Sequence, residues 1–330
     1  MAKKQIKKIK RHQYGKIKLF AGSASKELAE KIATHLDMEL EDHELVQFPN
    51  ENLFPKLGSS VRGQDTYIIQ TTSSPVHRNY MELKLMLQTL KLDSAARVTA
   101  VFPYMCYARS DKKDQPRVSI AARMVADEIS ALADRYMTFD LHAGQIQGFF
   151  SIPGDVLTTF DILVDHLHTI LPEMDNPIVV TADLGFAKKA RNFADKLDTP
   201  LALIEKRRKG NDAKAKAMGV IGEIRGHDVI LVDDEIDTGG SIVEAVDMVK
   251  QYGAQDIYIV FVHPVLSLNA SERLAALPVK QFICTDTIPI PEEKAKHFGD
   301  RLTVLTIADL LAEVILRANQ CKSVGALFDE

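Results

Sequence analysis

Short β-rich runs alternate with helical patterns along most of the 330-residue sequence, and this alternation restricts the possible folds more than any other feature. The first step is a predicted strand at 16–23, KIKLFAGS, followed by a predicted helix at 25–36 that Ser25 is placed to cap. Repeated strand–helix steps are typical of βαβ units around a mainly parallel sheet, so the sequence predicts an α/β protein. Further strands are expected at 66–70, 98–102, 136–139, 178–182, 201–206, 229–234, 257–263, 282–286 and 302–307, and further helices at 79–92, 119–132, 187–196, 240–252 and 308–319.

The length of the chain predicts two domains, because 330 residues exceed the size at which one hydrophobic core usually suffices. A Pro-containing stretch at 167–177 separates the two runs of alternation. We predict an N-terminal domain at 1–155, of which 1–15 form a basic tail, and a C-terminal domain at 156–302. The closing segment, 303–330, contains a strand and a helix that fit either domain.

The bulk charge and the cysteines exclude several classes of function. A formal net charge of −4 gives no general affinity for nucleic acid or for an anionic membrane, because phosphate binding needs a basic surface. No run approaches the roughly 18 apolar residues of a membrane span, and the N-terminus lacks the apolar core of a secretory signal. Cys106, Cys284 and Cys321 are widely spaced and odd in number, which fits neither a disulfide framework nor a zinc site. We expect a cytoplasmic protein without nucleic-acid or membrane partners.

The segment at 229–241, VILVDDEIDTGGS, joins an apolar strand to an acidic pair and a Gly-containing turn that opens a helix. Unpaired N–H groups at a helix start attract phosphate, and glycines let the main chain approach it. Carboxylates at the carboxyl end of a strand accept hydrogen bonds from vicinal sugar hydroxyls. The alternative is an acidic turn with a helix cap. The residues predicted to bind ribose 5-phosphate are Asp233, Asp234, Asp237, Thr238, Gly239, Gly240 and Ser241.

This loop resembles the phosphoribosyl-diphosphate (PRPP) loop shared by type I phosphoribosyltransferases and ribose-phosphate diphosphokinases. The stretches at 107–129, YARSDKKDQPRVSIAARMVADEI, and 140–157, DLHAGQIQGFFSIPGDVL, are similar to the diphosphokinases' nucleotide-binding stretch and metal-site signature. The resemblance runs from about Lys18 to the C-terminus, whereas ordinary phosphoribosyltransferases are shorter. It implies two tandem type I phosphoribosyltransferase-like domains, each a mainly parallel sheet flanked by helices.

The resemblance to the diphosphokinases also implies an activity. That family transfers the β,γ-diphosphoryl group of ATP to the anomeric hydroxyl of ribose 5-phosphate, which yields PRPP and AMP. Such a reaction needs charge neutralisation by metal ions and cationic side chains. By resemblance, His142 and Asp183 hold Mg²⁺, and Lys206 and Arg208 are the catalytic cations of a mobile loop that follows the strand at 201–206. No residue stands out as a general base.

The sequence contains no G-x-x-x-x-G-K-[S/T] motif, so a Walker loop is excluded and ATP must bind at a site of another kind. By resemblance, Arg109, Ser110 and Asp111 line the ATP site together with His142. By composition alone, the basic stretch after Tyr107 is also compatible with a solvated loop.

Two segments depart from the family pattern. In FPNEN, Phe48 is retained, but Asn50 and Asn52 replace the carboxylates that in the family reach the adenine of ATP on a neighbouring subunit. Because Asn donates as well as accepts hydrogen bonds, we expect a donor choice broader than ATP alone. By resemblance, the segment at 182–190, ADLGFAKKA, forms a pyrophosphate loop. In it Phe186 follows Gly185 where the family usually has two adjacent small residues, so close backbone approach to phosphate is hindered.

The resemblance further implies a homo-oligomer in which dimers build a hexamer, with ADP and phosphate as effectors near Ser60 and Arg62. Two alternatives stay open. One is a catalytically silent or regulatory family member, which the changes at 48–52 and Phe186 would fit. The other is a phosphoribosyltransferase, which consumes PRPP.

Overall fold

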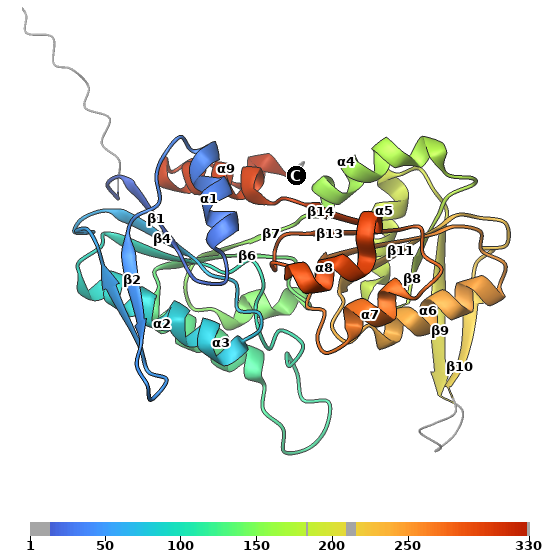
Figure 1. Ribbon diagram of the computed structural model, residues 1–330, viewed down its shortest axis with the longest axis horizontal. Helices are drawn as coiled ribbons and strands as arrows, with labels where there is room; N and C mark the ends of the chain where they lie inside the picture. Colours follow the sequence, from blue (N-terminus) through green and yellow to red (C-terminus); the bar gives the residue numbers. More distant parts are fainter. Residues whose placement is uncertain (1–13, 183, 209–215, 329–330) are drawn as a thin grey trace, which may run out of the picture. The chain divides into compact units, whose positions relative to one another are not determined.

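The computed structural model describes residues 14–182, 184–208 and 216–328. The chain divides into two compact units, shown in Figure 1. The first unit comprises Met1–Thr138, Ala143–Asp155 and Ala308–Glu330, and the second comprises Phe139–His142 and Val156–Ile307. Each unit is thus assembled from segments that lie far apart in the sequence.

The first unit contains a five-stranded sheet in the order β1-β4-β5-β6-β7. Its strands are β1 (Ile17–Ala21), β4 (Asp65–Ile69), β5 (Arg97–Val101), β6 (Arg135–Phe139) and β7 (Gly154–Leu157). β1, β4, β5 and β6 pair in parallel, and every residue of β4 and β5 is buried, as expected for strands covered on both faces. The covering helices are α1 (Lys26–His35), α2 (Val76–Leu92), α3 (Ala121–Leu132) and α9 (Ala308–Asn319). Figure 1 shows α1 beside α9, and α2 beside α3.

The second unit contains a seven-stranded sheet in the order β10-β9-β8-β11-β12-β13-β14. The strands are β8 (Ile178–Thr181), β9 (Leu201–Arg208), β10 (Lys216–Ile221), β11 (Val229–Glu235), β12 (Ile257–His263), β13 (Gln281–Thr285) and β14 (Leu302–Leu305). β9 and β10 pair antiparallel, and the other neighbours pair in parallel. The helices are α4 (Phe160–Ile170), α5 (Ala187–Lys196), α6 (Gly240–Gln251), α7 (Ala270–Ala275) and α8 (Glu292–Phe298).

Successive residues of the second sheet enter different hydrophobic clusters, so this sheet is also covered on both faces. Val180 and Leu231 belong to one cluster, and Val179 and Ile230 belong to the other. Mainly parallel sheets flanked by helices confirm the predicted α/β fold class. In the part of the chain that the structure describes, no helix is both long and apolar enough to span a membrane.

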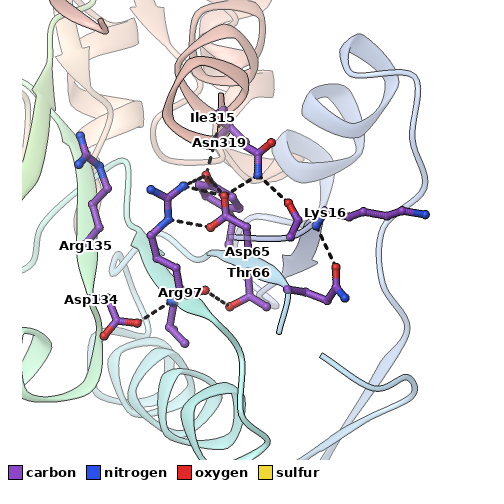
Figure 2. Close-up of polar contacts among 12 residues, drawn as sticks. Lys16, Asp65, Thr66, Arg97, Asp134, Arg135, Ile315 and Asn319 are labelled. Atoms are coloured by element: carbon purple, nitrogen blue, oxygen red, sulfur yellow. Dashed lines mark hydrogen bonds and ion pairs between the residues drawn. The ribbon is translucent and has the colours of Figure 1, made fainter. Parts of the chain in front are cut away.

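A buried polar cluster fixes α9 to the first unit (Figure 2). The Asp65 carboxylate accepts hydrogen bonds from Arg97 Nε at 2.7 Å and Nη2 at 2.6 Å, from the Tyr67 hydroxyl at 2.8 Å, and from Asn319 Nδ2 at 2.9 Å. Asn319 lies at the end of α9 and also donates to the Gly15 carbonyl at 3.2 Å. The buried charge of Asp65 is therefore compensated on several sides. β14 pairs with β13 in the second sheet, so 303–330 contributes to both units.

Ser25 is the N-cap residue of α1, as predicted, but the capping hydrogen bond from its side chain does not form. Ser25 precedes the helix, but its hydroxyl accepts a hydrogen bond from the backbone N–H of Thr71 at 2.8 Å and caps nothing. The Thr71 N–H lies in a buried loop after β4 and needs an acceptor there. The Ser25 hydroxyl thus makes a tertiary hydrogen bond with Thr71 in place of the expected local bond to the start of α1.

An antiparallel hairpin, β2 (His43–Gln47) and β3 (Leu53–Leu57), has no counterpart among the predicted strands. It carries Pro55, and its residues are half-buried or exposed, which weakens the hydrophobic signal of a strand. The turn of this hairpin contains the segment at 48–52.

The predicted loop after 206 begins later than expected. The backbone of Lys206 and Arg208 lies within β9, where these residues pair with Met218 and Lys216 of β10. Antiparallel pairing with β10 extends β9 to Arg208, beyond the predicted end at 206, and the basic sequence of this segment does not indicate that pairing. Residues 209–215 lie outside the described part of the chain.

Candidate active site

The loop between β11 and α6 has the geometry of an anion-binding turn. β11 is buried through Val232, Asp233 is half-buried, and Asp234 is buried at the carboxyl end of the strand. Gly239 is the N-cap of α6 with φ of +75°, and a Cβ placed there would lie 3.3 Å from Leu274 Cδ2. The positive φ favours glycine at this position, and the Leu274 side chain would have to shift to admit a Cβ. The amides of the first turn of α6 are consequently open to close approach by a ligand.

Contacts with neighbouring segments fix the shape of this loop. Ser267 N–H donates to the Asp237 carbonyl at 3.0 Å, and Arg273 Nη1 donates to the Thr238 carbonyl at 3.1 Å. The loop remains accessible, because Thr238 and Ser241 are exposed and Asp237 and Gly240 are half-buried. The five predicted residues of the phosphate-binding turn therefore lie together, on a backbone held from outside the loop.

His142 and Asp234 form the central pair of the site. His142 Nδ1 lies 2.7 Å from Asp234 Oδ2, although 92 positions separate the two residues. Burial raises the pKa of the Asp234 carboxyl, but the hydrogen bond from His142, the positive charge of that ring when it is protonated, and smaller contributions from Asp233 and Lys189 together lower that pKa. The sequence did not predict this contact. His142 was expected to bind the metal together with Asp183, whereas Asp234 was expected to bind the ribose.

The pair fits a site for a divalent cation. A carboxylate only accepts, so Nδ1 of a neutral His142 carries the proton and Nε2 carries the lone pair. A carboxylate that fixes the tautomer of a metal-binding histidine is a common arrangement. The His142 side chain retains 30% exposure, which leaves it accessible to a ligand. Asp183 lies outside the described residues, and among those described no cluster of three or more His, Cys, Asp or Glu side chains forms a metal site.

Arg109, Ser110 and Asp111 lie in the first unit, so they and His142 are not brought together within one unit. Arg109 is exposed, and Ser110 is half-buried with its N–H donating to the Tyr107 carbonyl at 2.9 Å. Asp111 is buried, and its carboxylate accepts a hydrogen bond from Gln145 Nε2 at 2.8 Å. Asp111 therefore holds the segment in place, while Arg109 faces solvent.

The hairpin turn exposes Phe48, Asn50 and Asn52. The Asn50 side chain accepts from the Asn52 N–H at 3.3 Å, and Glu51 between them adopts φ of +68°, a region that favours glycine. Next to the turn is a cavity of about 850 Å³. Asn52 lines it, together with Gln47, Glu51, Leu53, Pro75, Val76, His77, Arg78, Met81 and Leu85.

Phe186 does not project from the predicted pyrophosphate loop. Its ring is buried in one of the clusters of the second unit, and Lys189 Nζ lies 5.5 Å from the ring centroid. The side chain that departs from the family pattern is thus absorbed by the hydrophobic core.

Comparison with known proteins places this geometry in a family. Residues 17–132 match the family model described as the N-terminal domain of ribose phosphate pyrophosphokinase, and residues 211–329 match the phosphoribosyl synthetase-associated domain. Ribose-phosphate pyrophosphokinase of Caldanaerobacter subterraneus is 44% identical over 314 residues, which cover 94% of this chain and 98% of that protein. The chain belongs to the ribose-phosphate pyrophosphokinase family. The Deinococcus radiodurans relative of the same name is 42% identical, with 94% and 97% covered.

A solved structure supports the same family. The phosphoribosylpyrophosphate synthetase from Mycobacterium smegmatis is 39% identical and superposes with a TM-score of 0.86 over 92% of this chain and 98% of that chain. A match of this length confirms the predicted fold class. A pyrophosphokinase also accounts for residues 17–132, which a shorter phosphoribosyltransferase would leave unexplained.

Proposed function

We propose that the protein transfers the β,γ-diphosphoryl group of ATP to the anomeric hydroxyl of ribose 5-phosphate, giving PRPP and AMP for nucleotide biosynthesis. The anomeric oxygen bonds to the β-phosphorus, and the bond from that phosphorus to the oxygen bridging to the α-phosphate breaks. The bridging oxygen leaves with AMP, and the hydroxyl proton is released. The observation that carries the proposal is the 2.7 Å contact between His142 and Asp234, because it joins the predicted metal end to the predicted ribose end.

The ribose 5-phosphate end is formed by the β11–α6 loop. Its turn, Asp237 to Ser241, would bind the 5-phosphate through the first amides of α6 and the two exposed hydroxyls. Asp233 and Asp234 would accept hydrogen bonds from the ribose hydroxyls. A loop shaped before binding holds the anomeric hydroxyl in position without further ordering cost.

The metal is proposed to be Mg²⁺, held by His142 and Asp183. Bound there with the donor phosphates, Mg²⁺ supplies neutralisation of the charge that develops during transfer. Few protein ligands are needed, because Mg²⁺ keeps several waters and binds substrate phosphates. Asp234 orients His142 through the Nδ1 contact.

Cationic side chains complete the proposed catalytic machinery. Lys206 and Arg208 would neutralise the reacting phosphates from the β9–β10 hairpin, whose antiparallel pairing carries their backbone. Arg109 with Ser110 and Asp111 would bind the ATP phosphates, the buried Asp111 acting through its contact with Gln145.

Several finer features belong to the same proposal. Phe48, Asn50 and Asn52 would contact the nucleotide base of ATP on a neighbouring subunit, in a homo-oligomer of dimers that build a hexamer. ADP and phosphate would act as effectors near Ser60 and Arg62. A cytoplasmic location agrees with three cysteines that form no disulfide.

Product analysis with the purified chain tests the proposal. The chain is incubated with ATP, Mg²⁺ and ribose 5-phosphate, and AMP and PRPP are quantified against samples that lack one component. Equal amounts of AMP and PRPP, dependent on ribose 5-phosphate, support the proposal. A folded chain that yields no product with any nucleotide would instead be a silent or regulatory member of the family.

A further inference from the structure

His263 connects two parts of the active site that the sequence keeps apart. It lies at the end of β12, where it pairs with Glu235 of β11, and only 4% of it is exposed. Its carbonyl accepts a hydrogen bond from the Ile236 N–H at 3.1 Å. The backbone of His263 thereby fixes the residue directly before the predicted phosphate turn at 237–241.

The side chain of His263 reaches the segment that carries His142. His263 Nε2 lies 3.4 Å from the carbonyl oxygen of Asp140, and Nδ1 lies 3.0 Å from Thr287 Oγ1. Because a carbonyl only accepts, the contact with Asp140 places the proton on Nε2, which leaves Nδ1 of the neutral ring as an acceptor beside Thr287 Oγ1. Burial lowers the pKa of His263 despite the carboxylates of Asp140 and Asp234, so the ring is neutral in this arrangement.

The segment Phe139–His142 needs such contacts. It groups with the second unit, although Thr138 before it and Ala143 after it group with the first. Asp140 has φ of +34°, which is strained for a residue with a side chain. Its carboxylate accepts from Thr158 Oγ1 at 2.9 Å and from Thr159 N–H and Oγ1 at 2.7 and 2.9 Å. His263 adds the contact to the Asp140 carbonyl, two residues before His142.

We infer that His263 is a positioning residue of the active site, which sets His142 in register with the ribose-phosphate loop. The side chain holds Asp140 and hence His142, and the backbone holds Ile236 and hence the turn. This inference rests on the proposed function, because it assigns the effect to the metal end of that site. His263 itself touches no substrate.

The two contacts of His263 can be separated experimentally. His263→Leu removes the side-chain contact and leaves the backbone contact, so metal binding should weaken while ribose 5-phosphate binding persists. His263→Gln keeps an N–H donor near the position of Nε2 and should restore metal binding. Val262→Ala is the matched control, because this neighbouring buried residue lies in the hydrophobic core and loses methyl groups without touching Asp140.

Manganese binding gives a readout independent of turnover. The full chain is titrated with Mn²⁺ by electron paramagnetic resonance in the presence of ribose 5-phosphate and α,β-methylene-ATP, and the KM for ribose 5-phosphate is measured alongside. For His263→Leu we expect the Mn²⁺ dissociation constant to rise about tenfold or more, the range for residues that orient metal ligands. His263→Gln and Val262→Ala should stay within about threefold, and the KM for ribose 5-phosphate should be similar in all variants.

Two results would overturn the inference. In the first, His263→Leu binds Mn²⁺ as tightly as Val262→Ala does. In the second, His263→Leu loses Mn²⁺ and ribose 5-phosphate affinity equally, which would mean general damage to the site. A wild-type chain that forms no PRPP would overturn the proposed function instead, and the Mn²⁺ titration would still report on the contact of His263 with Asp140.

Discussion

Each unit contains a carboxylate in a short contact with a cationic or titratable partner, and the two environments differ. In the first unit, Asp65 is fully buried and accepts hydrogen bonds from Arg97, Tyr67 and Asn319 (Figure 2). In the second unit, Asp234 is also buried, but its partner His142 is 30% exposed. A carboxylate thus makes a short hydrogen bond in both regions, but ligands can reach only the region of Asp234 and His142.

We therefore expect the Asp65 cluster to contribute to stability and the Asp234–His142 pair to contribute to function. Donors surround Asp65, and the resulting cluster joins β4, β5 and α9 without space for a substrate. Asp234 orients an accessible imidazole at the strand end where ligands of α/β proteins bind. Loss of the first contact should destabilise the folded chain, and loss of the second should slow the reaction.

Lys206→Ala should give the largest effect and affect activity alone. If Lys206 neutralises the reacting phosphates, turnover should fall about 10³-fold or more, as for other cations that stabilise phosphoryl transfer. The change in melting temperature should be small, and both are measured on the same sample by AMP formation and circular dichroism. Lys26→Ala, an exposed lysine of α1, is the control and should keep full turnover. Unchanged turnover in Lys206→Ala would remove this residue from the mechanism.

Asp65→Ala should show the opposite behaviour. It leaves the buried Arg97 guanidinium without its carboxylate, so the free energy of unfolding should fall by about 3–5 kcal/mol. Urea denaturation followed by circular dichroism measures the loss, and turnover per folded molecule should persist. The double variant Asp65→Leu/Arg97→Met removes both charges and should be more stable than Asp65→Ala. A loss below about 1 kcal/mol would contradict a structural role for the cluster.

Asn319→Ala should have a smaller effect on the same cluster. It removes the hydrogen bonds from Asn319 to Asp65 and to the Gly15 carbonyl, which should cost about 1–3 kcal/mol because buried acceptors lose a donor. Gln320→Ala, at the exposed neighbouring position, is the control. Equal stability of the two variants would show that the hydrogen bonds of Asn319 do not contribute to holding α9.

Nucleotide choice should show the smallest effect. With Asn50 and Asn52 in the hairpin turn, kcat/KM for GTP or CTP should lie within about tenfold of ATP, since one hydrogen bond of difference is worth about that factor. Asn50→Asp/Asn52→Glu should shift the preference towards ATP, and Glu44→Gln on the same hairpin should leave it unchanged. Near-exclusive use of ATP by the wild-type chain would refute the broader choice.

Local sequence patterns predicted the parts of the fold that have strong periodicity. The helices α5 and α9 begin and end at the predicted residues, and the buried strands β4, β5, β11 and β12 lie where apolar runs indicated them. The hairpin β2–β3 was missed, because it is half-exposed and contains Pro55. Ser25 stands at the predicted N-cap position, but its hydroxyl accepts a hydrogen bond from the distant Thr71 N–H, which no local pattern indicates.

In the candidate site, too, the sequence predicted groupings of residues that are close along the chain but not contacts between distant residues. The turn at 237–241 and the acidic pair before it are contiguous, so the sequence predicted their grouping. The contact of His142 with Asp234 spans 92 positions, and that of His263 with Asp140 spans 123, so only the fold reveals them. The apolar run that ends in His263 predicted a strand, but nothing in it indicated the contact with Asp140.

The most direct test of the account is turnover of Asp234→Asn, measured as AMP formation dependent on ribose 5-phosphate and set against the melting temperature. The substitution keeps the size of the side chain and removes the carboxylate that orients His142. We expect turnover to fall about 100-fold or more, equivalent to about 2.7 kcal/mol of barrier, with a melting temperature close to that of the wild-type chain. Wild-type turnover, or a loss that only parallels unfolding, would contradict the claim that the His142–Asp234 pair is the functional centre.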